Sequence, residues 1–205
     1  MLAARYKPLF NRLLHPVAAW IARSGIPASA LTLSAPLIGL VACVAFVRTR
    51  AVLPFCVAMT VAASLDGLDG AVARASGHVT KRGAYLDAMG DRYVEAMALI
   101  AAAWVSGYWL LSSLVLAGSL LVSYAKARAA MEVAVSNAEW PDLMERTERL
   151  VVFLGGLAAS AVIPWRPFGR DLFWWTLLVL VMSVHLTAIQ RVLRACRLID
   201  ERAAR

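Results

Sequence analysis

The 205-residue chain is poor in charged residues, and acids are the scarcer sign. Only 17% of it is charged, with 13 aspartates and glutamates against 21 lysines and arginines, while 61% is hydrophobic. Soluble domains contain about 25% charged and about 45–50% apolar residues. The composition therefore excludes an ordinary soluble domain and a disordered chain. A net charge of +8 in so apolar a chain favours an anionic membrane surface or anionic substrates over nucleic acid.

Cysteine is scarce as well. The three cysteines (Cys43, Cys56 and Cys196) are odd in number and have no paired spacing, and two of them lie in apolar runs. This excludes a disulfide framework. A cleavable signal peptide is not expected, because basic residues interrupt the N-terminal 28 residues. These are Arg5, Lys7, Arg12, His15 and Arg23.

Long apolar segments predict an all-α integral membrane protein. A membrane-spanning helix needs about 20 largely apolar residues. Six segments qualify once turns are placed at residues 48–50, 106–107 and 164–170: 28–47, 51–69, 84–106, 108–126, 150–165 and 172–190. The predicted six-helix membrane domain covers residues 28–193. Residues 1–27 have apolar side chains at helical spacing with charges between them, which predicts an amphipathic helix in the membrane interface, and residues 194–205 form a basic cytoplasmic tail.

The distribution of basic residues predicts the orientation. With six spans both termini share a side, and most lysines and arginines fall on that side. The opposite side holds only Arg48, Arg50, Arg166 and Arg170. Because cytoplasmic loops are enriched in Lys and Arg, we expect a multi-pass protein of the inner or plasma membrane. Both termini and the active site are expected on the cytoplasmic side.

Four aspartates lie at or inside the second and third predicted spans, where a charge is costly. Asp66 and Asp69 are three residues apart, and Asp87 and Asp91 are four apart, so each pair shares a helix face. If the two helices are neighbours, the pairs converge. Carboxylate oxygens at this density suit Mg²⁺, Mn²⁺ or Ca²⁺. Four carboxylates also suffice to bridge two ions, an arrangement used in phosphoryl transfer.

Small and basic residues near these acids indicate a phosphate ligand. Glycines allow a ligand or a backbone to approach closely, and basic or hydroxyl side chains supply donors for a polyanion. The residues concerned are Gly67, Gly70, Ala71, Ala73, Gly77 and Gly83, with Arg74, Thr80, Lys81 and Arg82.

Two other interpretations compete. In a structural ion-pair cluster, Arg74 and Arg92 would neutralise the acids, but two arginines do not balance four aspartates. A cation-coupled transporter also uses acids inside the membrane. That alternative accounts for the aspartates but not for the glycines and the basic loop between the helices.

From Asp66 to Asp91 the chain has the sequence D-G-L-D-G-A-V-A-R, eight residues, then G-A-Y-L-D-A-M-G-D. This resembles the signature of the CDP-alcohol phosphotransferases, D-x-x-D-G-x-x-A-R-x8-G-x3-D-x3-D, and every fixed position matches. The resemblance implies a six-helix membrane fold and a homodimer. It also implies transfer of a phosphatidyl group from a CDP-linked lipid to the hydroxyl of a polar alcohol, with release of CMP.

The resemblance also implies residue roles. Two divalent ions, Mg²⁺ or Mn²⁺, would be held by the metal ligands Asp66, Asp69, Asp87 and Asp91. Asp91 would also be the general base. The CDP moiety would be bound by Gly70, Ala73, Arg74, Thr80 and Gly83, and by Thr32. Thr32 is the position retained from the family's P-N-x-x-T stretch, in which Ser29 replaces the asparagine.

The second half resembles the branch of the family that uses inositol phosphate. The resemblance lies in S-Y-A-K-A-R-A at residues 123–129 and E-R-T-E-R-L at residues 145–150. It implies that cations hold the acceptor's phosphate, and the candidates are Lys126, Arg146, Arg149 and Arg191. Glycerol 3-phosphate is also dianionic, so a phosphatidylglycerophosphate synthase remains an alternative. The positive-inside rule would also place basic residues at this level, and Arg146 and Arg149 cannot be ranked.

Overall fold

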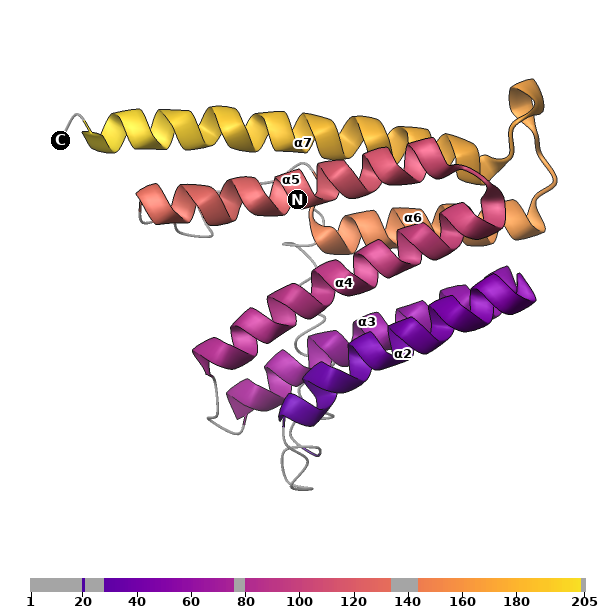
Figure 1. Cartoon of the computed structure of the whole chain (residues 1–205), viewed down its shortest axis with the longest axis horizontal. Helices are drawn as coiled ribbons and strands as arrows, with labels where there is room; N and C mark the ends of the chain where they lie inside the picture. Colours follow the sequence, from indigo (N-terminus) through magenta and orange to yellow (C-terminus); the bar gives the residue numbers. More distant parts are fainter. Residues whose placement is uncertain (1–19, 21–27, 76–79, 134–143, 204–205) are drawn as a thin grey trace. The chain divides into compact units, whose positions relative to one another are not determined.

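The computed structural model describes residue 20 and residues 28–75, 80–133 and 144–203 (Figure 1). Within these ranges the side chains of residues 28–31, 74, 75 and 203 are not described. The described residues form six long α-helices and one short 3-10 turn, and no β-strand occurs among them. The predicted interfacial helix of residues 1–27 lies outside the described residues, apart from Trp20.

Each helix overlaps one of the six predicted segments. Their bounds are α2 Ala28–Thr49, α3 Val52–Ala75, α4 Lys81–Ser106, α5 Trp109–Glu132, α6 Arg146–Val162 and α7 Leu172–Ala203, with the 3-10 turn η2 at Pro167–Gly169. The predicted break at residues 106–107 is confirmed. Gly107 has a φ of 79°, and its N–H donates to the carbonyl of Ala103 at 2.8 Å. Glycine adopts this left-handed conformation without steric cost and so ends α4.

Four helices of the described residues are long and apolar enough to cross a membrane: α2, α3, α5 and α7. The chain is therefore a multi-pass membrane protein. The other two helices, α4 and α6, are not long and apolar enough to qualify, each for a different physical reason. Several charges lie between the start of α4 and residue 95, including Asp87, Asp91, Arg92 and Glu95. α6 has 17 residues, about 25 Å of helix, against a hydrocarbon core of about 30 Å.

The helices group into two compact units, α2–α4 and α5–α7. In the first unit, α2 packs against both α3 and α4. Phe46 of α2 stacks on Phe55 of α3 with ring centroids 4.3 Å apart. A Cβ added to Gly90 of α4 would lie 3.2 Å from the side chain of Pro36. Small residues at such contacts allow membrane helices to approach closely, and α2 thereby holds α3 and α4 in place.

In the second unit, α7 packs against α5 and α6. A Cβ on Gly118 of α5 would lie 2.3 Å from Val184, and one on Gly156 of α6 would lie 2.1 Å from Thr176. Both glycines are therefore required for the close approach of their helices to α7. α7 is a single helix through Ala203, so it continues well beyond the predicted end of its span at residue 190.

Candidate active site

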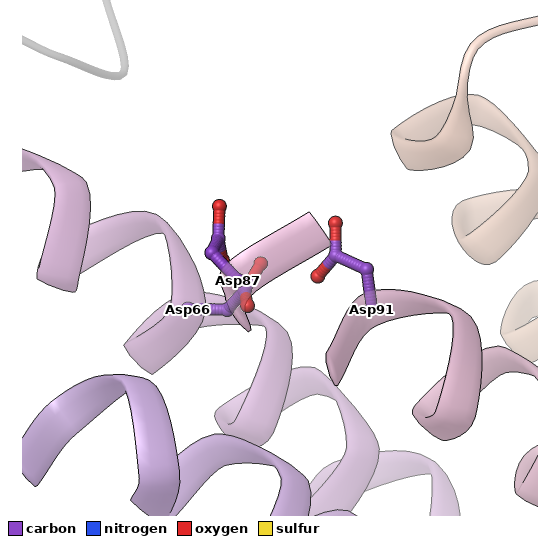
Figure 2. Close-up of side chains that lie close together, drawn as sticks. All are labelled: Asp66, Asp87 and Asp91. Carbon is purple, nitrogen blue, oxygen red and sulfur yellow. The ribbon is translucent and has the colours of Figure 1, made fainter. Parts of the chain in front are cut away.

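Three of the four predicted aspartates come together. Asp66 of α3 and Asp87 and Asp91 of α4 each offer a carboxylate oxygen, and these three oxygens lie within 4.8 Å of one another (Figure 2). All three side chains are half-buried. The four-residue spacing places Asp87 and Asp91 on one face of α4. The convergence predicted from the sequence is thus confirmed for these three residues.

The mutual repulsion of these three carboxylates favours binding of a cation. Two carboxylates at this separation repel each other by about 3 kcal/mol at an effective dielectric constant of 20, and three pairs are involved. The donor set consists of carboxylate oxygens, which Mg²⁺ and Mn²⁺ prefer as ligands. The residues present therefore fit a divalent ion of this class.

Asp69, the fourth predicted ligand, lies one turn from Asp66 but outside this group of three. Its side chain is buried, with 5% exposed. The hydroxyl of Thr32 on α2 donates to its Oδ2 at 2.5 Å. Thr32 was predicted to contact the nucleotide, and the structure shows it fixing one carboxylate of the signature.

Arg92 lies beside the cluster but is shared between two acids. Its Nη1 is 2.9 Å from Oε2 of Glu95, and its Nη2 is 4.0 Å from Oδ2 of Asp91. The closer partner, Glu95, was missed from the sequence, although its three-residue spacing from Arg92 is a signal for an ion pair on one helix face. An arginine engaged in this way does not balance three carboxylates, which weakens the structural ion-pair alternative.

The predicted CDP-binding residues lie around the facing ends of α3 and α4. Gly70 and Ala73 are half-buried on α3. Thr80 is the N-cap of α4, and its hydroxyl oxygen accepts from the N–H of Gly83 at 3.0 Å. A Cβ on Gly83 would lie 3.0 Å from that same oxygen, so the glycine leaves room for the cap. The backbone of Arg74 belongs to α3, whereas its side chain and that of Ser29 lie outside the described residues.

Two of the predicted acceptor-binding cations lie at a similar level of the α5–α7 unit. Arg191 of α7 is 8% exposed, and its guanidinium donates to the carbonyl of Val122 on α5. Lys126 follows Val122 by one helical turn on the same face and is half-buried. The side chain of Arg191 thus links the two helices close to Lys126.

The other two cations begin α6. A reciprocal capping box starts this helix, in which the side chain of Glu148 accepts from the N–H of Glu145 at 2.9 Å. Arg149 is 5% exposed, and its Nη1 donates to the carbonyl of Met144 at 3.3 Å. Arg146 is half-buried. The structure therefore separates the two arginines by burial, which spacing alone could not do.

A family-wide sequence pattern, that of the CDP-alcohol phosphatidyltransferases, matches residues 26–189. The chain belongs to this family. Its matched region contains the carboxylate cluster and the whole D-x-x-D to D-x3-D signature. The predicted activity class is confirmed, and the family's group-transfer chemistry replaces the transporter alternative.

Named relatives of this phosphatidyltransferase point to one branch. Archaetidylinositol phosphate synthase of Pyrococcus horikoshii is 34% identical over 78% of this chain and 84% of its own length. Phosphatidylinositol phosphate synthase of Mycobacteroides abscessus is 33% identical over 74% of this chain and 70% of its own length. The sequence resemblance of the second half to this branch agrees with both.

The fold is also that of a solved protein. The crystal structure of Mycobacterium tuberculosis phosphatidylinositol phosphate synthase with CDP-DAG bound matches with a TM-score of 0.78. The identity is 24%, and the match covers 90% of this chain and 94% of the other. A second structure of that synthase, in complex with manganese and citrate, matches with a TM-score of 0.77 at 24% identity, over 89% of this chain and 88% of the other.

Proposed function

We propose that this phosphatidyltransferase moves the phosphatidyl group of a CDP-linked lipid to a hydroxyl of inositol phosphate and releases CMP. The observation that carries the proposal is the set of converging carboxylates of Asp66, Asp87 and Asp91 inside an intact family signature. The relatives named above, which are inositol phosphate lipid synthases, support the choice of acceptor.

The cluster would hold Mg²⁺ or Mn²⁺, with Asp69 completing a set of four carboxylates for two ions. The oxygen donors of the cluster support this, as does the manganese in the crystal of the solved neighbour. Bound divalent ions neutralise the charge of a diphosphate and polarise the phosphorus that is attacked.

The side chains of this chain then have distinct tasks. The carboxylate of Asp91 takes the proton of the acceptor's hydroxyl, and the resulting oxygen attacks the phosphorus that carries the lipid. The new P–O bond forms as the bond to CMP breaks, and CMP leaves with that electron pair. Gly70, Ala73, Arg74, Thr80 and Gly83 bind the CDP moiety. A dianionic acceptor needs fixed donors, which Lys126, Arg146, Arg149 and Arg191 supply.

We further propose that all six helices cross the membrane, α4 and α6 included, with both termini and the carboxylates on the cytoplasmic side. The excess of lysine and arginine in the corresponding connections supports this orientation. The CDP moiety of the substrate is water-soluble, whereas its lipid chains are not. A site at the membrane surface accommodates both parts of the substrate. Residues 1–27 would lie in the interface, residues 194–205 in the cytoplasm, and the protein would be a homodimer, as its family implies.

An acceptor panel tests the function. Purified protein is given labelled CDP-diacylglycerol, Mg²⁺ or Mn²⁺, and one of four alcohols: inositol phosphate, glycerol 3-phosphate, serine or free inositol. We expect CMP release and a labelled lipid product with inositol phosphate, because only a phosphorylated acceptor uses the four cations. Faster transfer to glycerol 3-phosphate would make the protein a phosphatidylglycerophosphate synthase. No CMP release with any alcohol would contradict the proposed transferase.

Thr32→Val is expected to weaken divalent-metal binding. Loss of the hydrogen bond that fixes Asp69 removes support for a proposed ligand, and such changes typically cost about 10–100-fold in metal affinity or activity. Binding is measured from the electron paramagnetic resonance signal of free Mn²⁺, alongside the Mn²⁺ dependence of CMP release. Thr32→Ser keeps the hydroxyl and serves as the matched control. An unchanged Mn²⁺ affinity with a raised KM for the CDP-linked lipid would assign Thr32 to the nucleotide instead.

A further inference from the structure

The connection between α6 and α7, residues 163–171, presents aromatic and cationic side chains together. Phe168 is 93% exposed and Trp165 is 61% exposed. Arg166 and Arg170 are exposed beside them. Figure 1 shows this α6–α7 loop extending past the start of α7 and to one side of that helix. Most of the surface of these two side chains therefore lies outside the core of the α5–α7 unit.

The tip of the loop is a hydrogen-bonded turn. Residues 167–169 form η2, which is closed by hydrogen bonds from the N–H of Gly169 to the carbonyl of Arg166 and from the N–H of Arg170 to the carbonyl of Pro167. Phe168 has a φ of 54° and a ψ of 30°. This left-handed conformation is unfavourable for a bulky residue. The chain therefore adopts a strained backbone at the position where it displays its most exposed aromatic ring.

The base of the loop is tied to the first turns of two membrane helices. Asp171 accepts from the N–H of Trp174 on α7 at 2.9 Å, and from the hydroxyl of Tyr108, the residue before α5, at 3.0 Å. Burial raises the pKa of Tyr108, and its hydrogen bond to Asp171 adds to this. The phenol therefore keeps its proton at neutral pH, and the tie persists. Trp175 donates to the carbonyl of Pro167 at 3.4 Å.

This attachment sets the level of the loop. The apolar stretches of α5 and α7 that are long enough to cross a membrane start at Trp109 and Leu172, directly after the tied residues. The loop is therefore at the boundary between hydrocarbon and water. Lys126 and Arg191 lie toward the far ends of the same two helices, so the loop belongs to the opposite leaflet.

We propose that the α6–α7 loop is a membrane-surface anchor in which Phe168 and Trp165 insert among lipid headgroups and Arg166 and Arg170 bind lipid phosphates. Aromatic rings favour the headgroup level, and arginine forms bidentate hydrogen bonds with phosphate. Charge complementarity favours an anionic lipid surface, since Asp171, the acid of the loop, already accepts two hydrogen bonds. The guanidinium of Arg170 also lies 5.7 Å from the ring centroid of Trp174 in the first turn of α7. This contact holds the guanidinium against the aromatic side chains at the start of that helix.

The test measures the depth of the loop in liposomes. The full chain carries Cys196→Ser, since Cys43 and Cys56 are buried and Cys196 is exposed. A fluorescent label on Trp165→Cys is quenched by nitroxide lipids labelled either at the headgroup or deep in the acyl chain. We expect strong quenching by the headgroup nitroxide, weaker quenching by the deep one and little by aqueous iodide. A label on Glu201→Cys, exposed near the end of α7, is the control and should respond to iodide instead.

Two further variants separate the contributions. In Phe168→Asn the asparagine can adopt the left-handed backbone conformation, but the aromatic ring is lost. The label at residue 165 should then become several-fold more accessible to iodide. Phosphatidylglycerol in the vesicles should increase headgroup quenching of the label at residue 165 when both arginines are present, and Arg166→Gln with Arg170→Gln should abolish that increase.

Equal iodide quenching at residues 165 and 201, without quenching by nitroxide lipids, would overturn the proposal. So would disulfide cross-linking of two Phe168→Cys copies without lipid quenching, because that result would make the loop a contact between copies of the chain.

Discussion

Asp91→Asn is expected to stop CMP release almost completely while the protein still folds. The amide has nearly the same shape as the carboxylate but cannot accept the proton of the acceptor's hydroxyl. General-base catalysis contributes about 10²–10⁴-fold, and the substitution also removes one of the three converging carboxylates. The measurement is the rate of CMP release at saturating inositol phosphate, with the thermal unfolding midpoint in detergent as a check on folding.

The control for this variant is Glu95→Gln. Glu95 lies one turn further along α4, pairs with Arg92 and is not one of the three carboxylates. Its loss should change the rate far less than the loss of Asp91. Measuring Mn²⁺ affinity in Asp91→Asn separates the two roles of the residue, because a lost base lowers kcat even when the metal is saturating. CMP release that persists in Asp91→Asn would move the base to another carboxylate of the cluster.

The positions of the helices were predictable because a helix that crosses a membrane requires a long run of apolar residues, which is visible in the sequence. Their ends were less so. α6 begins at Arg146 rather than at residue 150 because Glu145 and Glu148 cap it, and α7 continues through Ala203. Hydropathy detects where a helix enters lipid, whereas capping and propensity decide where the helix itself begins and ends.

The site was predictable as far as spacing allows. The spacing indicated that Asp66, Asp69, Asp87 and Asp91 converge, and all of them except Asp69 do. Three-residue spacing puts Asp66 and Asp69 about 60° apart around α3, so only the rotation of the helix decides which of them faces α4. That rotation comes from packing against α2, where Thr32 meets Asp69. The hydrogen bond from Arg191 to Val122 joins residues far apart in sequence, and no local pattern reports such a pair.

Gly156→Ala is expected to destabilise the protein, whereas Gly155→Ala, one residue earlier on α6, is expected to stabilise it slightly. A Cβ at residue 156 would lie 2.1 Å from Oγ1, 2.3 Å from Cγ2 and 2.6 Å from Cβ of Thr176 on α7. The hydroxyl of Thr176 donates to the carbonyl of Leu172 at 2.8 Å, which fixes its rotamer. Overpacking of this kind costs about 1–3 kcal/mol. Nothing lies within 4 Å of a Cβ at residue 155, and alanine is a better helix former than glycine by about 1 kcal/mol.

Thermal unfolding midpoints of the two variants in detergent measure this difference, and second-site changes identify its cause. Thr176→Ala should fail to rescue Gly156→Ala, since the Cβ of Thr176 is itself too close, whereas Thr176→Gly restores the room. Because the rescue requires loss of that Cβ, it distinguishes a steric contact between α6 and α7 from a general weakness of α6. Equal midpoints for Gly155→Ala and Gly156→Ala would show that α6 and α7 are not in this close contact in the folded protein.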